Sequence, residues 1–377
     1  MNNINQIHVY FGTRKVGMMA TVDRFFSAFE YDQEWLQNGF SISPLSLPLE
    51  KKLFIPKIDP FDGLFGVFSD SLPDGWGRLL VDRLMLKYDM NPRTINQLTR
   101  LAIVADSGMG ALTYRPEMRF TEEQIDLNLD EIAAQCARIL DAEQTDDLDE
   151  LFRLGGSSGG ARPKILTKVA GEDWIIKFPS TGDGKDIGLQ EYEYSLCAKE
   201  CGIDMEETRL FPSNYGPGYF GTKRFDRIID EEGNVGRKHM LTASALLETS
   251  HRVPNLDYGI LMQLTKTLTS DVEQLLRLFR LMCFNVYAHN RDDHSKNFSY
   301  IYEESTGDWR LSPAYDLTYS YSLGGEHATT INGSGLLPSD EDIMQVAKKS
   351  NISAVIAKRE MNKVKEIVFE RLRKYLE

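Results

Sequence analysis

The chain has 377 residues, of which 42% are hydrophobic and 26% charged, and its formal net charge at pH 7 is −13. This composition is typical of a globular protein, and the length suffices for two or three structural units. The acidic balance argues against general coating of nucleic acid. No apolar run reaches the roughly 18 residues of a membrane span, and the N-terminus has no signal-peptide pattern. We therefore expect a cytoplasmic protein that does not enter the membrane.

Residues 1–117 are predicted to form a β-rich module that also contains helices. Short strand-like runs at 9–11 and 16–19 flank a turn that starts at Gly12. Residues 118–150 are strongly acidic but keep one apolar face, which predicts a linker helix. The four cysteines lie in apolar settings, which is typical of buried thiols in a reducing compartment.

Residues 151–236 are predicted to form a smaller lobe rich in strands. The runs 164–169 and 173–178 indicate a hairpin turned at 170–172, followed by a helix over 188–201 and a strand pair that ends near 221–227. Residues 237–377 are predicted to be helical. The fold class expected is therefore α+β and bilobal, with a β-rich N-terminal module and N-lobe followed by an all-helical C-lobe.

The segment 270–288 predicts a helix that is buried on nearly all sides. Apolar residues recur at helical spacing and fill most of its surface, and Ser270 with Glu273 suggests a capping box at its start. This helix runs into the polar segment 289–297. A buried helix that ends in such a segment favours a rigid set of charges over an ordinary surface turn.

The polar segment contains the arrangement that a phosphoryl-transfer enzyme needs. Asp292 and Asn297 lie five residues apart, and Asp316 follows after a short hairpin-like insert. One carboxylate can accept the proton of an attacking hydroxyl, while an amide oxygen and a second carboxylate hold Mg²⁺. Such a pair alone is a weak signal, and His289 with His294 leaves open a metal-hydrolase cluster.

Two further features suit a bound triphosphate. The run Gly155–Gly160 would let backbone N–H groups approach phosphate oxygens, although a flexible linker explains its composition equally well. Lys177 lies within an apolar strand, where its charge needs an anionic partner such as a phosphate or Glu191. These residues together predict an ATP-dependent phosphotransferase.

In combination, these segments resemble the HipA family of bacterial serine/threonine kinases, the toxins of type II toxin–antitoxin pairs. The segments that carry the resemblance are the catalytic loop 292–299, the metal-binding segment 311–316, the phosphate loop 157–164, the hinge strand 222–227 and, in the first module, 45–49, 72–74 and 106–112. The resemblance covers nearly the whole chain, and it implies ATP and Mg²⁺ as cofactors.

The resemblance also implies a role for each matching residue. Asp292 is the expected catalytic base, and Asn297 and Asp316 are the expected magnesium ligands. The expected nucleotide contacts are Ser157, Ser158, Gly159, Lys177, Lys223, Phe225, His294 and Tyr315. Ser157 aligns with the serine that such kinases phosphorylate to switch themselves off, but the adjacent Ser158 makes the acceptor ambiguous. A phosphoserine there adds up to about two negative charges.

The implied partners are a DNA-binding antitoxin of HipB type, operator DNA through that antitoxin, and a protein substrate such as an aminoacyl-tRNA synthetase. Two other functions remain open. One is a small-molecule kinase of aminoglycoside-phosphotransferase type, which shares the Asp–Asn spacing. The other is an idle ATP-binding co-repressor whose basic segment 348–377 supports an antitoxin on DNA.

Overall fold

The computed structural model describes residues 3–23, 25–118, 128–143, 148–229 and 235–377. The chain divides into two compact units. Unit 1 comprises residues 1–188, 210–241 and 245–249, and unit 2 comprises residues 189–209, 242–244 and 250–377. None of the helices in the described ranges is both long and apolar enough to cross a membrane.

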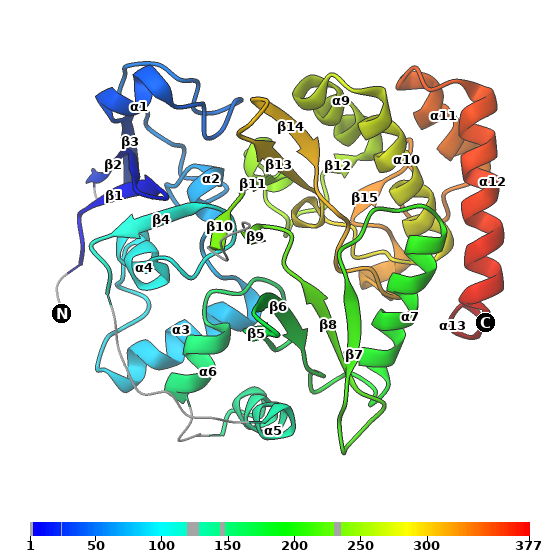
Figure 1. Cartoon of the computed structure of the whole chain (residues 1–377), viewed down its shortest axis with the longest axis horizontal. Coiled ribbons are helices and arrows are strands. Elements are labelled where there is room, and N and C mark those ends of the chain that lie inside the picture. The colour runs from blue at the N-terminus through cyan, green and yellow to red at the C-terminus, as the bar shows by residue number, and fades with distance from the viewer. Residues whose placement is uncertain (1–2, 24, 119–127, 144–147, 230–234) are drawn as a thin grey trace. The chain divides into compact units, whose positions relative to one another are not determined.

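Unit 1 contains one four-stranded sheet, most of a second four-stranded sheet, and several helices (Figure 1). Its strands are β1 (Gln6–Phe11), β2 (Arg14–Val22), β3 (Phe26–Tyr31), β4 (Leu112–Arg115), β5 (Lys164–Val169), β6 (Glu172–Lys177), β8 (Tyr219–Lys223), β9 (Arg227–Ile229) and β10 (Val235–Arg237). Its helices are α1 (Gln33–Asn38), α2 (Gly66–Ser69), α3 (Gly75–Lys87), α4 (Gln97–Val104), α5 (Leu129–Leu140) and α6 (Leu148–Gly155).

Four elements include residues of both units. They are α7 (Ile187–Glu200), β7 (Thr208–Phe211), β11 (His239–Thr242) and α8 (Ala243–Leu246).

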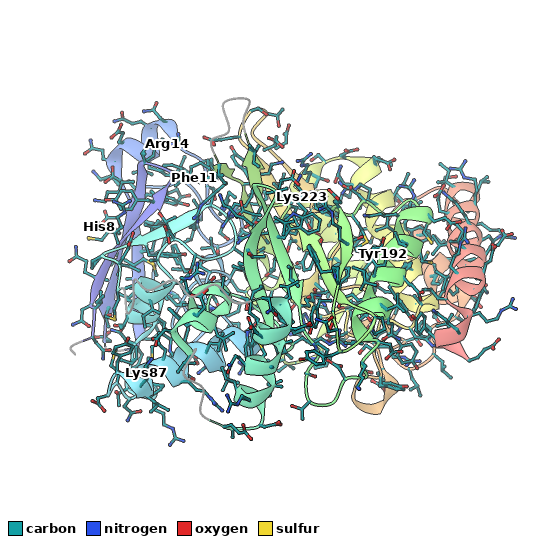
Figure 2. All side chains as sticks on the ribbon, turned by 60° about the horizontal axis from the view of Figure 1, so that its bottom comes forward. His8, Phe11, Arg14, Lys87, Tyr192 and Lys223 are labelled. Atoms are coloured by element: carbon teal, nitrogen blue, oxygen red, sulfur yellow. The ribbon has the colours of Figure 1, made fainter. Side chains whose placement is uncertain are left out.

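The first sheet of unit 1 has the order β3-β2-β1-β4. The predicted N-terminal hairpin is confirmed, because β1 and β2 pair antiparallel and Phe11 faces Arg14 across the turn. Gly12 takes the left-handed conformation that this tight turn requires (φ 58°). The Arg14 guanidinium lies over the Trp35 ring at 4.5 Å, so a cation–π contact covers this end of the sheet (Figure 2).

The second sheet has the order β5-β6-β8-β7. The predicted hairpin is confirmed, with its turn at Ala170 and Gly171, which both have positive φ, as two-residue hairpin loops of type I′ require. One apolar cluster joins this sheet to helices from three sequence segments, and its buried members are Trp76, Leu80, Ile132, Cys136, Ile139, Leu148, Leu151, Leu154, Ile165, Ile176, Phe178 and Tyr219. The acidic segment thus contributes its apolar face to this core.

The predicted linker helix is represented by α5, which begins with a capping box between Asn128 and Glu131. Residues 119–127 and 144–147, which the prediction also included, lie outside the described residues. The boundaries proposed for the domains stay a prediction.

Unit 2 is mainly helical but also contains four short strands. Its strands are β12 (Leu256–Asp257), β13 (Ser299–Glu303), β14 (Asp308–Leu311) and β15 (Thr329–Thr330). Its helices are α9 (Tyr258–Thr269), α10 (Val272–Tyr287), α11 (Asp340–Lys349), α12 (Ala354–Arg371) and α13 (Arg373–Leu376), with 3₁₀ turns η1 (Ser295–Asn297) and η2 (Leu323–Gly325).

The prediction of an all-helical C-lobe is therefore wrong. β13 and β14 form an antiparallel hairpin, and β12 pairs parallel with β15. Strands of two to five residues are too short to show a period of two in the sequence, so their apolar residues were indistinguishable from helical ones. The hairpin corresponds to the insert that separates Asn297 from Asp316.

The predicted buried helix is present as α10, and its C-terminal half is buried from Leu281 to Tyr287. The predicted capping box is wrong. Asp271 is the N-cap and accepts a hydrogen bond from the Glu273 amide, whereas Ser270 ends α9 in the left-handed conformation (φ 51°). An aspartate and a serine are both good caps, and only the meeting of two helices decides between them.

Candidate functional site

The residues predicted to form the site fall into two groups, one in each unit, and each group is described within its own unit. The group in unit 2 lies on the catalytic loop, residues 292–299, and on the segment that ends at Asp316. The group in unit 1 lies on the phosphate loop, residues 157–164, and on the strands that follow it.

The catalytic loop presents Asp292 to solvent, because 65% of its side-chain surface is exposed. The neighbouring residues are held within the loop. The Asn297 amide nitrogen donates a 2.6 Å hydrogen bond to the Asp292 carbonyl. The His294 Nδ1 atom accepts from the Lys296 amide at 3.2 Å and so caps the turn η1. An exposed carboxylate on a fixed backbone is well placed to accept a proton.

The side chain of the next residue, Asp293, is fully buried, in contrast to the exposed side chain of Asp292. Its carboxylate accepts hydrogen bonds from the Tyr258 hydroxyl at 3.0 Å, from His327 Nδ1 at 2.9 Å and from the Thr329 amide at 3.2 Å. The Thr329 hydroxyl donates to the Asp293 carbonyl. These bonds join the catalytic loop to α9 and β15. Sequence reasoning named Asp293 only as a neighbour and missed this anchor.

Further buried amides extend this network beneath the loop. Asn285, near the end of α10, donates to the Tyr258 hydroxyl at 2.9 Å, and the Asn290 side-chain amide donates to Oδ1 of Asn285 at 2.9 Å. Burial and the nearby Asp293 carboxylate raise the pKa of Tyr258 well above its ordinary value, so the phenol stays protonated and can donate. An asparagine within an apolar helix was the available sequence signal for this network.

The second carboxylate of the group, Asp316, is fixed through its neighbour Tyr315. The Tyr315 hydroxyl donates to the Lys296 carbonyl at 2.6 Å and is also paired with the Ser299 hydroxyl. Tyr315 thus ties the Asp316 segment to the residue that precedes Asn297. Asp316 itself has a positive φ of 55°, which is uncommon for a residue other than glycine. The expected contact of Tyr315 with the nucleotide stays a prediction.

The donor set of this group fits Mg²⁺. Because the Asn297 amide nitrogen is bonded to the Asp292 carbonyl, its Oδ1 atom is the one left to meet a cation. One amide oxygen and one carboxylate suit an ion that keeps water and substrate phosphates as its other ligands. No group of three or more His, Cys, Asp or Glu residues suited to a metal occurs within the described ranges.

In unit 1, the phosphate loop follows α6 with both of its serines buried. The Ser157 hydroxyl donates to the Ser107 carbonyl at 2.9 Å, and the Ser158 hydroxyl donates to the Gly155 carbonyl at 2.5 Å. Gly159 is exposed, and Gly160 adopts a φ of 86°. A serine that is to be phosphorylated must leave this arrangement, because neither hydroxyl is accessible in it.

Two lysines face each other beside this loop. Lys164 of β5 pairs directly with Lys177 of β6, and the two residues are only 7% and 9% exposed. The Lys164 ammonium also lies close to the loop, 2.6 Å from where a Cβ atom of Gly160 would stand. Like charges directly opposite each other on two strands are destabilising unless an anion compensates them. Sequence reasoning named Lys177 but missed that the pairing register brings Lys164 to it.

The hinge segment is fixed by a buried cluster of charges. Lys223 ends β8 and is ion-paired with Glu172 (Figure 2), and Phe225 is half-buried. The next residue, Asp226, forms ion pairs with Arg224 at 2.7 Å and with Arg227 at 2.6 Å. Its carboxylate also accepts a hydrogen bond from the Gly110 amide at 2.7 Å. The 106–112 motif is therefore the partner of the hinge. The expected contacts of Lys223 and Phe225 with the nucleotide stay a prediction.

Comparisons with known proteins agree on one family. The chain matches the HipA-like C-terminal domain over residues 156–373 and the HipA N-terminal domain over residues 7–115. A relative named "Putative kinase Y4mE", from Sinorhizobium fredii, is 26% identical over 415 residues, which cover 99% of this chain and 92% of the relative.

A solved HipA structure has a similar fold to this chain. The HipA of Shewanella oneidensis MR-1, determined in a complex with HipB and operator DNA, superposes with a TM-score of 0.72 and 17% identity, covering 98% of this chain and 90% of that one. At this level of identity, the likeness shows the fold alone.

The matches to the family model and to the named relative identify the class of protein as a kinase. Since the match to the HipA-like C-terminal domain extends over more than half of the chain, this protein belongs to the HipA family. The family prediction made from the motifs is confirmed, and membership of a kinase family implies ATP as the phosphoryl donor.

Proposed function

We propose that this HipA-family kinase transfers the γ-phosphoryl group of ATP to a serine or threonine hydroxyl of a protein, with Asp292 as the general base. The observation that carries the proposal is the contrast within one loop. Asp292 is 65% exposed, while Asp293 beside it is fully buried and hydrogen-bonded. Asp293 thus anchors the loop, and Asp292 is exposed where a substrate hydroxyl can approach it.

Asn297 and Asp316 would hold Mg²⁺. The hydrogen bonds of Tyr315 and of the Asn297 amide support the proposal, since they fix both ligands relative to Asp292. When bound, the ion would neutralise negative charge on the phosphates. Asp292 would take the proton of the substrate hydroxyl, and His294 would keep the loop in shape through its bond to the Lys296 amide.

The paired lysines of β5 and β6 would compensate the charge of the phosphates. Lys164 and Lys177 lie directly opposite each other and are both buried, and their two ammonium groups would add to the attraction for a polyanion such as a triphosphate. The exposed glycine of the phosphate loop would allow close approach of the phosphate oxygens to backbone N–H groups.

Phosphorylation of the loop itself forms part of the proposal. Ser157 or Ser158 would accept a phosphate after leaving its buried position, and the new charge would oppose return because the loop would have to bury it again. This would leave the kinase inactive after one event.

A toxin role in a toxin–antitoxin pair is proposed by analogy. The Shewanella relative was solved with its HipB partner and operator DNA, which supports a DNA-binding antitoxin as the partner of this chain in a bacterial cytoplasm. Its protein substrate would then be a translation factor such as an aminoacyl-tRNA synthetase. Comparison of phosphopeptides in cells that express the wild-type chain or Asp292→Ala would identify the substrate.

The central test is intact-mass spectrometry of the purified chain before and after incubation with Mg²⁺ and ATP. We expect a gain of about 80 Da, one phosphate, on the peptide that contains Ser157 and Ser158. Asp292→Ala and Asp316→Ala should reduce the rate by at least about 10³-fold while melting like the wild type. Phosphate transfer by Asp292→Ala at the wild-type rate would refute the assignment of the base.

A control distinguishes the two serines and the competing substrate class. Ser157→Ala and Ser158→Ala should differ in self-modification, with the loss confined to the true acceptor. If an unmodified wild-type chain gains no phosphate but phosphorylates small aminoglycoside-like compounds, the protein-kinase proposal fails.

A further inference from the structure

The start of α3 lies directly against the phosphate loop, within unit 1. Asp74 occupies the N-cap position of α3, but its side chain makes no capping hydrogen bond to that helix. Its carboxylate accepts a hydrogen bond from the Gly160 amide instead. An N-cap aspartate ordinarily satisfies the amides of its own helix. Here the Asp74 carboxylate instead accepts a hydrogen bond from the phosphate loop, 86 residues further along the chain, and this contact requires another explanation.

The backbone completes this contact in the reverse direction. The Trp76 amide, in the first turn of α3, donates to the Gly160 carbonyl at 2.9 Å. Gly160 thus has both of its backbone groups engaged by the start of one helix. The Trp76 amide, which Asp74 does not cap, therefore finds its hydrogen-bond acceptor in the Gly160 carbonyl of the phosphate loop.

Two glycines of α3 make this approach possible. A Cβ atom on Gly75 would lie 2.3 Å from the Gly160 carbonyl oxygen, and one on Gly77 would lie 2.2 Å from the Ser158 carbonyl oxygen. Both distances are too short for a side chain. The helix start is therefore shaped to receive the loop, and Asp74 supplies the polar contact of this surface.

This contact fixes the part of the loop that faces outward. Gly159 and Ala161, on either side of Gly160, are exposed, and among the described residues neither of their amides has a hydrogen-bond acceptor. The Lys164 ammonium lies beside the same turn. Two exposed amides on either side of Gly160, with this ammonium beside the same turn, are groups that can bind an anion.

We propose that Asp74 is a positioning residue for ATP: it holds Gly160 so that the amides of Gly159 and Ala161 are set to receive the phosphates. This inference rests on the proposed role of the phosphate loop. Asp74 does not touch the phosphates, because its own negative charge would repel them. It acts only through Gly160, and so links the N-terminal module to nucleotide affinity.

The experiment measures the dissociation constant for Mg-ATP by calorimetry on the full chain. The Asp292→Ala background prevents self-modification during the titration. Asp74→Ala should weaken binding about tenfold, the factor expected from loss of one charge-assisted hydrogen bond. Asp74→Asn keeps the acceptor oxygen and should recover affinity to within about threefold of the parent.

A matched control separates positioning from general loosening of the helix. Asp82 lies on the same helix and accepts from Arg100 at 2.9 Å, away from the loop. Asp82→Ala should leave the affinity for Mg-ATP unchanged. Amide hydrogen exchange provides the second readout: in Asp74→Ala, the peptide that contains Gly160 should exchange faster, while the strands β5 and β6 keep their protection.

The possible outcomes are distinguishable. Unchanged affinity and unchanged exchange in Asp74→Ala would overturn the proposal, as would weaker binding with unchanged exchange at Gly160. Equal loss of affinity in Asp82→Ala or no recovery in Asp74→Asn would overturn it too. If the parent chain does not bind Mg-ATP, the proposed function fails, yet faster exchange at Gly160 in Asp74→Ala would still show that Asp74 holds the loop.

Discussion

Two fully buried carboxylates, Asp226 in unit 1 and Asp293 in unit 2, stabilise the two groups of site residues by different means. Asp226 is compensated by two arginines, which carry a charge at every pH of interest. Asp293 accepts instead from a phenol, an imidazole and a backbone amide. Both anchor a segment next to a functional residue, but only the first is a cluster of permanent charges.

The difference determines which substitutions are expected to destabilise the protein at Asp226 and at Asp293. A carboxylate between two guanidinium groups cannot be replaced by a neutral group without leaving buried positive charge. A carboxylate that accepts mainly from neutral donors can be replaced by an amide that accepts from most of them. The hinge in unit 1 is thus held by charge, and the catalytic loop in unit 2 by hydrogen-bond geometry.

The largest effect is expected for Asp226→Asn. The change leaves Arg224 and Arg227, which are 4% and 8% exposed, without their anion. We expect a loss of about 3–5 kcal/mol in unfolding free energy, measured by denaturant titration. Because Asp226 also holds the Gly110 amide, near the Ser107 carbonyl that binds Ser157, the phosphate loop should become more accessible to protease.

Replacement of all three charged residues provides the control for Asp226. A variant in which Asp226, Arg224 and Arg227 are all replaced by apolar residues should lose much less stability than Asp226→Asn. If Asp226→Asn is as stable as the wild type, charge compensation does not hold the hinge.

Acid should affect unit 1 in two separate ranges. Burial lowers the pKa of His239 from 6.5 to about 4, with only partial opposition from its hydrogen bond to the Ile42 carbonyl. Between these values the unfolded chain binds a proton that the folded chain does not. Stability should therefore fall by about 3 kcal/mol as the pH drops from 6.5 to 4.

Asp226 should respond only at lower pH. Burial alone would raise its pKa, but Arg224 and Arg227 lower it from 3.8 to about 2. Its stabilising contribution is complete above pH 3.8 and is lost as the pH falls toward 2. Denaturant titrations of the wild type and His239→Gln test both statements. The histidine variant should lack the decline between pH 6.5 and 4, and an unchanged decline would contradict the assignment.

The smallest effects are expected at Asp293. Asp293→Asn keeps an acceptor for the Tyr258 hydroxyl and should cost only about 1 kcal/mol, whereas Asp293→Ala leaves buried donors unpaired and should cost about 1–3 kcal/mol. Asp292→Ala is the matched neighbour, and its exposed side chain predicts a stability change within about 0.5 kcal/mol. Equal destabilisation by Asp292→Ala and Asp293→Ala would refute the division of roles between them.

Local patterns in the sequence were sufficient for several elements. The hairpins β1–β2 and β5–β6, the helix α7 and the buried helix α10 were predicted because short alternating runs, turn residues and helical periodicity act within a few residues of one another. Where two local signals competed, as Ser270 and Asp271 did for one cap, the prediction failed. The all-helical prediction for the C-lobe failed at the two-residue strands β12 and β15, which depend on pairing with each other rather than on their own pattern, whereas the hairpin-like insert before Asp316 corresponds to β13 and β14.

The sequence by itself determined the family, and it supplied the chemical groups proposed for the site. The spacing of Asp292, Asn297 and Asp316 is a local property, and the combination of motifs was specific enough to predict a HipA-type kinase. Only the tertiary structure decided which aspartate is buried and which exposed, that Lys164 faces Lys177, and that Asp74 holds Gly160. These contacts join residues that are far apart along the chain, so their register and burial follow from packing, and no local pattern encodes them.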